Sequence, residues 1–197
     1  MPNPHIEIID SQILSDQWYV LKKITFRQED RHGHWHTVSR EAYDRGNGAV
    51  ILLYHKAKKT VVLTRQFRMP TYLNGNDSGM LIEACAGLLD HDEPEDCIRK
   101  ETEEETGFVV REVRKIFEAY MSPGSVTEVL HFFVAEYDDA MKKTQGGGLA
   151  RDHELIEVLE IPFDQSLGMI ASGEIRDAKT ILLLQYAALN NLFENDK

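Results

Sequence analysis

Residues 87–108 read GLLDHDEPEDCIRKETEEETGF, and the fold of the chain follows from this stretch. Pro94 suits the first turn of a helix, and Asp92 with Glu95 three positions later has the form of an N-cap and capping box. Gly107 suits the left-handed position that ends many helices. The stretch therefore predicts a loop, then a helix, and a helix stop at Gly107.

Three glutamates share one side of this predicted helix. Glu101, Glu104 and Glu105 are spaced i, i+3 and i+4, and Glu103 lies on the flank. Like charges at this spacing cost an isolated helix roughly 0.2–0.5 kcal/mol per pair, so we expect a positive group to face them. Mg²⁺ prefers oxygen ligands and completes its shell with water and substrate phosphates. The pattern favours a metal site for phosphate chemistry; the alternative is a solvated acidic helix.

The composition of the chain limits its class. Its 197 residues are 42% hydrophobic and 28% charged, which suits one globular domain or one domain with a small appended element. A net charge of −11 argues against a nucleic-acid or anionic-membrane surface. No apolar run approaches membrane-spanning length, and the N-terminus lacks the pattern of a signal peptide. Cys85 and Cys97 form no CxxC motif, so we expect buried thiols and a cytoplasmic location.

The same stretch resembles the Nudix box of the Nudix hydrolases. The box contains a glycine, a glutamate, Arg-Glu, an apolar residue, Glu-Glu, and glycine with an apolar residue. The matching positions are Gly87, Glu93, Lys100-Glu101, Glu104-Glu105 and Gly107-Phe108. Lys100 replaces the arginine, Thr102 replaces the apolar residue, and six residues rather than seven separate Glu93 from Lys100. The Glu-x-x-Glu-Glu core is intact.

Segments outside the box extend the resemblance over nearly the whole chain. They are YDRGNGAVILLYH, RQFR, LIEACAGLLD, EAYMSPG, IEVLEIPF and GEIRDAKT, and they are similar to the branch of GDP-mannose, nucleotide-sugar and ADP-ribose pyrophosphatases. The resemblance implies an α/β fold, a Nudix α/β/α sandwich with a mixed sheet and an N-terminal antiparallel strand subdomain. It divides the chain into residues 1–44 and 45–197, and it implies that the first part helps to build a homodimer.

The order of apolar segments predicts the elements of this fold. We expect strands at 6–13, 18–27, 34–43, 48–55, 60–68, 80–86, 108–117, 128–135 and 155–161, and helices at 163–172 and 180–192. Broken alternation near Lys22 and Lys23 predicts a β-bulge. Residues 142–151 contain a triple glycine and are predicted to be the most flexible stretch, a mobile loop beside Glu154.

Several candidate site residues come from the resemblance. It implies metal ligands at the Ala86 carbonyl, Glu101, Glu105 and Glu154, with Glu104 nearby. Asp152 and Glu157 are alternatives to Glu154, and the general base is either Glu105 or Glu154. Substrate contacts are implied at Trp18, Arg40, Glu41, Glu128 and Lys179. Arg68 is a candidate on its own chemistry, because guanidinium donors match phosphate oxygens; a strand-end salt bridge is the alternative.

The activity that the resemblance implies is Mg²⁺-dependent hydrolysis of a nucleoside diphosphate sugar, with Mn²⁺ as a substitute. GDP-mannose would give GMP and mannose 1-phosphate. One alternative is ADP-ribose or another nucleotide sugar as the substrate. Another is a non-catalytic module that binds a nucleotide, which the shortened box and Lys100 favour and the intact glutamates disfavour.

Overall fold

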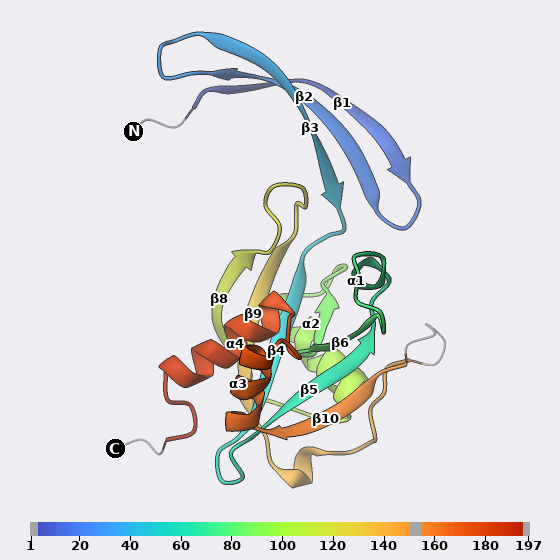
Figure 1. The fold of residues 1–197 in the computed structure, drawn as a ribbon, viewed down its shortest axis with the longest axis vertical. Helices are drawn as coiled ribbons and strands as arrows, with labels where there is room; N and C mark the ends of the chain where they lie inside the picture. Colours follow the sequence, from blue (N-terminus) through green and yellow to red (C-terminus); the bar gives the residue numbers. More distant parts are fainter. Residues whose placement is uncertain (1–3, 150–154, 195–197) are drawn as a thin grey trace. The chain divides into compact units, whose positions relative to one another are not determined.

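The structure is a computed structural model that describes residues 4–149 and 155–194. Contacts within the chain form two compact units (Figure 1). One unit contains Met1–Asn47 with Tyr120–Val129, and the other contains Gly48–Ala119 with Leu130–Lys197.

The first unit contains a three-stranded antiparallel sheet in the order β1-β2-β3. Its strands are β1 (Ile6–Asp16), β2 (Val20–Glu29) and β3 (Trp35–Asp44). The predicted bulge is present, but on the partner strand, because Leu14 of β1 is the extra residue opposite Leu21 and Lys22. None of the residues in these three strands is buried. The sheet therefore has no core of its own.

The second unit is built on a mixed sheet in the order β10-β5-β4-β9-β8, with β6 paired to β5 and β7 paired to β4. The strands are β4 (Gly48–His55), β5 (Thr60–Phe67), β6 (Met80–Glu83), β7 (Ala86–Leu88), β8 (Arg114–Tyr120), β9 (Val129–Glu136) and β10 (Glu157–Pro162). β4 and β9 are parallel, whereas β4 and β5 form an antiparallel hairpin. The predicted α/β class with a mixed sheet is confirmed.

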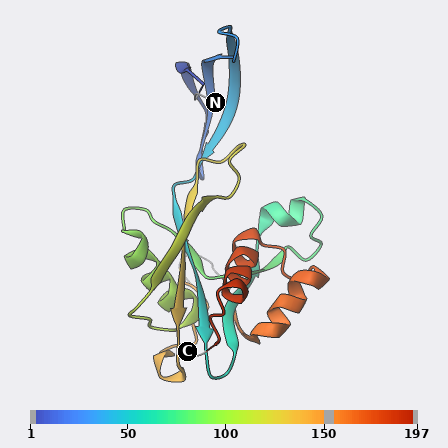
Figure 2. The same ribbon diagram turned by 90° about the vertical axis from the view of Figure 1, so that its left-hand side faces the viewer.

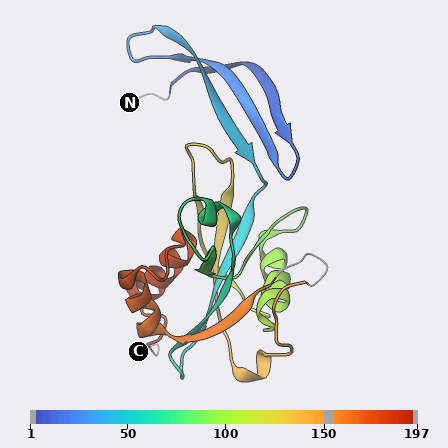
Figure 3. The same cartoon turned by 45° about the vertical axis from the view of Figure 1, so that its right-hand side comes forward.

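Helices cover both faces of this sheet. They are α1 (Met69–Leu73), α2 (Pro94–Glu101), the π-helical turn η1 (Thr102–Thr106), the 3-10 turn η2 (Asp139–Met141), α3 (Phe163–Ser172) and α4 (Ala178–Leu189). Figures 2 and 3 show α2 on one face, and α3 with α4 on the other. This is the predicted α/β/α sandwich. None of the helices in the described parts of the chain is long and apolar enough to cross a membrane.

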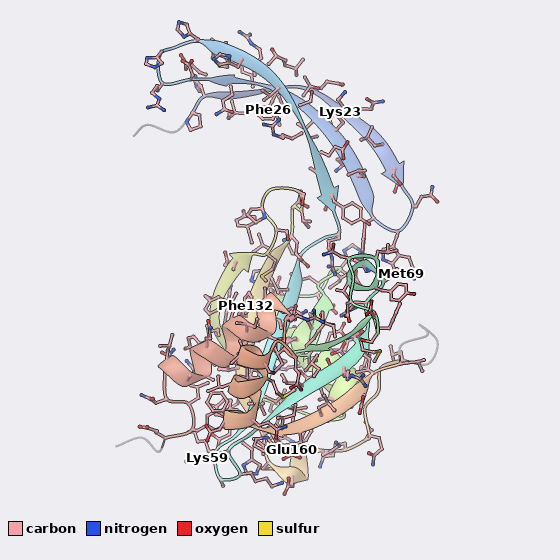
Figure 4. All side chains as sticks on the ribbon, in the orientation of Figure 1. Lys23, Phe26, Lys59, Met69, Phe132 and Glu160 are labelled. Carbon is pink, nitrogen blue, oxygen red and sulfur yellow. The ribbon has the colours of Figure 1, made fainter. Side chains whose placement is uncertain are left out.

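The core lies on the two faces of β4, where five consecutive residues from Ala49 to Leu53 are almost completely buried. One face packs against Ile98 of α2, and Leu183 and Leu184 of α4 are also fully buried. Figure 4 shows Phe132 of β9 among the side chains packed on the sheet. A strand buried on both sides reads as a continuous apolar run, which is why residues 48–55 were predictable.

The β4-β5 hairpin separates beyond its first residue pairs, and β6 and β7 fill the separation. β5 pairs with β4 at Thr60–Val62 and with β6 at Thr64–Phe67. β4 pairs with β7 through Val50 opposite Ala86. The predicted single strand at 80–86 is therefore two short strands with a crossover between them, and this crossover brings Ala86 beside β4.

Three other local predictions were wrong. Glu93, not Asp92, is the N-cap of α2, and its side chain makes no capping hydrogen bond. The strand predicted at 108–117 begins only at Arg114, because Phe108 is buried in the core instead of extending a strand. The helix predicted to end at residue 192 ends at Leu189, and Met69–Leu73 is a short helix where no element was predicted. We call α2 together with η1, residues 94–106, the glutamate helix. Gly107 ends this helix, as predicted, in the left-handed region with φ of 77°.

Candidate active site

Glu101, the last residue of α2, lies against the backbone of β7. A Cβ atom added at Gly87 would lie 2.2 Å from both Cδ and Oε1 of Glu101. No larger residue fits at position 87 while Glu101 keeps this conformation. β7 is held in place by β4, with Gly87 opposite Ala49. The glycine of the box thus lets a carboxylate approach the strand that contains Ala86.

The other glutamates lie on a π-helical turn instead of the α-helix that their spacing suggested. Glu105 is only 5% exposed, Glu104 is partly buried, and Glu103 is exposed. The predicted separation of inward-facing glutamates from a flanking Glu103 is confirmed. Single π turns are rare and are often found at functional sites.

Thr102 explains one departure from the box. It is completely buried at a position where the box has an apolar residue. Its hydroxyl donates to the carbonyl of Ile98 at 2.6 Å, and the hydroxyl of Thr106 donates to the carbonyl of Thr102 at 2.5 Å. A threonine that bonds to the preceding turn exposes no unsatisfied polar group, so it can occupy an apolar position.

Cys85 lies beneath the glutamates, in the crossover between β6 and β7. Burial raises the pKa of its thiol well above the ordinary value, and the charges of Glu105 and Glu101 raise this pKa further. The thiol therefore stays protonated and is a hydrogen-bond donor to Glu105. Cys85 and Cys97 are both free and buried, as the sequence predicted.

The donors near Gly87 suit a hard divalent cation. The carboxylates of Glu101 and Glu105 and the carbonyl of Ala86 are oxygen ligands, which Mg²⁺ prefers. Within residues 4–149 and 155–194, no group of three His, Cys, Asp or Glu side chains could by itself hold a metal ion. Mg²⁺ commonly uses one or two carboxylates and completes its shell with water and substrate phosphates. The described donors fit that mode of binding.

The triple glycine is tied to the end of the glutamate helix. Gly147 N–H donates to the carbonyl of Glu105 at 2.8 Å, and Gly148 N–H donates to that of Glu104 at 3.2 Å. In the stretch predicted to be flexible, residues 142–151, Gly147 and Gly148 are therefore held by hydrogen bonds to the glutamate helix. Glu154 and Asp152 lie outside the described residues. Glu157, the other alternative, pairs with Arg65 at 3.0 Å on β10.

A buried carboxylate joins the two cations expected to contact substrate. Glu83, at the end of β6, accepts from Nε of Arg68 at 2.7 Å and from Nζ of Lys179 at 2.5 Å. Lys179 also pairs with Asp177 at 2.9 Å. The strand-end salt bridge that was the alternative for Arg68 is thus present. It engages Nε, and the Arg68 side chain remains 41% exposed.

The charge of Lys179 is secured by these carboxylates. Burial alone would lower the pKa of its ammonium group, but Glu83 and Asp177 more than reverse this effect, so the pKa is raised. Asp177 also caps α4 by accepting from Thr180 N at 3.0 Å. Lys179 is therefore a charged, largely buried residue at the start of α4.

Glu83 is the site residue that sequence reasoning missed. Its sequence signal was a single acidic residue in the apolar run MLIEACAG, three positions before Ala86. An acid there is compatible with an exposed strand face. Only the folded chain shows that its side chain is 5% exposed and shared between two cations.

The remaining candidates lie in the first unit. Trp18 is 83% exposed, and Glu128 is nearly buried and pairs with Arg45 at 3.6 Å. Arg40 and Glu41 lie on one side of an open groove of about 680 Å³. Its other lining residues are Ala42, Tyr120, Pro123, Gly124, Ser125, Val126 and Thr127. Arg40 and Glu41 are thus brought together with the loop that precedes Glu128.

Comparison with known families matches the chain in two consecutive parts. Residues 5–43 match the family described as GDP-mannose pyrophosphatase NudK N-terminal domain. Residues 44–184 match the NUDIX domain. The second match covers more than half of the chain and contains the glutamates, Gly87, Arg68 and Lys179.

Curated relatives match over almost their full length. A Klebsiella pneumoniae protein is 57% identical over 192 residues, which are 98% of this chain and 96% of that protein. Salmonella typhimurium and Escherichia coli proteins are 59% and 58% identical over 189 residues, which are 96% of this chain and 98% of each protein. Each of the three is named GDP-mannose pyrophosphatase.

Proposed function

The chain belongs to the Nudix hydrolase family, and on this premise we propose that it is a Mg²⁺-dependent pyrophosphohydrolase that cleaves GDP-mannose to GMP and mannose 1-phosphate. The observation that carries the proposal is the Glu101 carboxyl group, which lies against Gly87 and acts on the same Cys85 thiol as the buried Glu105. The names of the full-length relatives support the choice of substrate. Nudix hydrolases generally need a divalent metal.

The glutamates have two tasks in this proposal. A bound Mg²⁺ neutralises diphosphate charge and acidifies a bound water, and Mn²⁺ can substitute for it. Glu101, Glu105 and the Ala86 carbonyl are the proposed ligands, with Glu154 as the fourth and Glu104 beside them. A carboxylate accepts a proton from the water that attacks one phosphorus while the bridging P–O bond breaks. Glu105 and Glu154 are the two candidates for this base.

The substrate contacts are proposed on exposure and charge. Arg68 keeps part of its guanidinium accessible beyond the Glu83 pair, and this part can bind the diphosphate. Lys179, which pairs with the same Glu83 carboxylate, adds a second positive charge. Trp18 offers an exposed aromatic face, and Arg40, Glu41 and Glu128 offer polar groups near the groove of the first unit. We propose that Trp18, Arg40, Glu41 and Glu128 bind the nucleoside and the sugar of the substrate.

Side-by-side hydrolysis of GDP-mannose and ADP-ribose tests the function. We expect purified protein with Mg²⁺ to release GMP and mannose 1-phosphate, to prefer GDP-mannose by at least about tenfold in kcat/KM, equivalent to about 1.4 kcal/mol, and to stop when EDTA removes the metal. Chromatography of the products measures both reactions. A preference for ADP-ribose would agree with the proposed hydrolysis but contradict GDP-mannose as the substrate. Nucleotide binding without turnover of any nucleotide sugar would favour the non-catalytic alternative.

We also propose a homodimer in which residues 1–44 form the dimerisation subdomain and residues 45–197 the hydrolase domain. The N-terminal sheet supports this, because an isolated sheet without a buried face is marginal in water. Its first strand exposes large apolar side chains, which are Ile6, Ile8, Ile9, Ile13 and Leu14. An apolar surface of this kind marks a protein interface. The occupant that we propose is a second copy of this chain.

Charges on β1 test the dimer. The double variant Ile8→Glu, Ile13→Glu should convert the protein from dimer to monomer, because each carboxylate would have to be desolvated in the interface. Light scattering coupled to gel filtration measures the mass. Leu189→Glu changes an apolar position on α4 that is more exposed than Ile8 or Ile13, and it should leave the dimer intact. A wild-type protein with the mass of one chain would contradict the proposal.

We place the enzyme in the cytoplasm. Both of its cysteines are free and buried. Free cysteines are typical of reducing compartments, where disulfides are rare.

A further inference from the structure

The segment from Lys143 to Gly148 closes the C-terminal end of the glutamate helix. A helix leaves its last carbonyl groups without partners inside the helix. Here the partners come from this segment: Lys143 N–H donates to the carbonyl of Gly107 at 2.8 Å, and Gly147 and Gly148 bond to the carbonyls of Glu105 and Glu104. Two of these carbonyls belong to Glu105, which is buried, and to Glu104, which is partly buried.

Two glycines allow this close approach of one backbone to another. A Cβ atom at Gly146 would lie 2.5 Å from the carbonyl oxygen of Glu105 and 2.6 Å from the carbonyl carbon of Thr106. A Cβ atom at Gly107 would lie 2.3 Å from the carbonyl oxygen of Thr144. Both glycines also have positive φ, 69° at Gly146 and 77° at Gly107. Backbone atoms cannot turn aside as a flexible side chain can, so a side chain at either position must push the π turn and the segment at 143–148 apart.

The same contacts exclude a simple linker role for the triple glycine. A flexible glycine linker makes no persistent backbone hydrogen bonds, whereas Gly147 uses both its N–H and its carbonyl. Its carbonyl accepts from Ile156 N–H at 3.3 Å. Ile156 is two residues beyond Glu154 in the sequence. Gly147 therefore links the backbone of Glu105 to that of Ile156, which follows residues 150–154 in the sequence.

We propose that Gly146, Gly147 and Gly148, here named the glycine clamp, are positioning residues that set the metal affinity of the glutamate site. The clamp holds the backbone carbonyls of Glu104 and Glu105, so it limits rotation of the π turn that carries these two carboxylates. The contacts it makes with the turn are backbone contacts. The proposal rests on the proposed function only in taking these glutamates as metal ligands.

Matched glycine variants separate the clamp from general backbone strain. Gly146→Ala adds both strain and the collision with Glu105. Gly173→Ala adds the same kind of strain at the end of α3, with φ of 82° and no atom within 4 Å of the new Cβ. The difference between the two variants therefore reports the collision. Mn²⁺ is the probe, and its dissociation constant is measured by electron paramagnetic resonance without substrate.

We expect Gly146→Ala to raise the Mn²⁺ dissociation constant by about 10- to 100-fold, the effect of losing a group that orients metal ligands. The Mg²⁺ concentration for half-maximal hydrolysis should rise in parallel. Gly173→Ala should leave both values within about twofold of wild type, well below that range. Circular dichroism and thermal melting check that each variant is folded.

Equal Mn²⁺ affinity in folded Gly146→Ala and wild type would overturn the clamp. If Gly146→Ala does not fold, Gly147→Ala takes its place, since its Cβ would meet only Ile156 O, at 3.6 Å, while the strain at φ of 109° moves the N–H that bonds to Glu105. A weaker Mn²⁺ affinity then supports the clamp and an unchanged one overturns it. Failure of the proposed function is distinct: wild-type protein would bind Mn²⁺ without hydrolysing a nucleotide sugar.

Discussion

The double variant Glu104→Gln, Glu105→Gln should lose about 10³-fold or more of the kcat/KM for GDP-mannose at saturating Mg²⁺ and remain folded. Glutamine keeps the shape of both side chains and removes the two charges that attract a divalent cation. Charge stabilisation by a metal ion is worth several kcal/mol, and each 1.4 kcal/mol is about tenfold in rate. Product release measured with and without added metal, together with circular dichroism, checks the prediction.

Glu103→Gln is the matched control for this variant. It makes the same chemical change on the same π turn, but Glu103 is exposed, whereas Glu104 is partly buried and Glu105 is buried. Its activity should stay within about twofold of wild type, since an exposed charge contributes less than about 1 kcal/mol. If the folded double variant kept an activity close to wild type, the assignment of Glu104 and Glu105 to the metal site would be wrong, whatever the activity of Glu103→Gln.

Glu83→Ala should produce the largest loss of stability, about 3 kcal/mol in the free energy of unfolding. The change removes the carboxylate that Arg68 and Lys179 share, and Lys179 keeps only Asp177. Burial lowers the pKa of Lys179, and the variant loses the larger of the two carboxylate effects that oppose it. The buried ammonium is therefore either poorly compensated or forced to lose its proton, and both outcomes cost stability. Urea unfolding measures the change, and thermal melting should fall by about 6–12 °C for a chain of this length.

The sign of the pH effect follows from the direction of that shift. A raised pKa in the folded state means that the contribution of Lys179 is complete below its unfolded pKa, which is about 10.4. The contribution is lost only as the pH rises through the higher folded value. The contribution of Lys179 to wild-type stability should therefore be constant from neutral pH to about pH 9, below the unfolded pKa of lysine.

Glu157→Ala is the control for Glu83→Ala. It breaks another strand-to-strand ion pair, with Arg65, but the two side chains are 42% and 56% exposed. An exposed pair contributes about 0–1 kcal/mol. If the two variants lost equal amounts of unfolding free energy, the ion pairs of Glu83 would stabilise the fold no more than an exposed ion pair does.

The glutamate helix shows how far local sequence reasoning reaches. Pro94 and Gly107 marked its two ends correctly, because the ring of proline and the missing Cβ of glycine act on their own backbone. Asp92 failed as the N-cap, because its neighbour Glu93 takes that position when the preceding loop is folded. The π turn was also unpredictable, since i, i+3, i+4 spacing assumes α-helical geometry.

The sequence by itself determined the class of the fold through the family resemblance. It also determined most of the strands and helices and the separation of Glu103 from the other glutamates, because alternation, helical spacing and turn chemistry act over a few residues. Only the tertiary structure decided which groups meet. Glu83 bonds to Arg68 and Lys179 across 15 and 96 positions of the chain, and the glycine clamp reaches Glu105 across a loop. Such contacts depend on the separation of β4 from β5 and on helix packing, which bring together residues that no local pattern links.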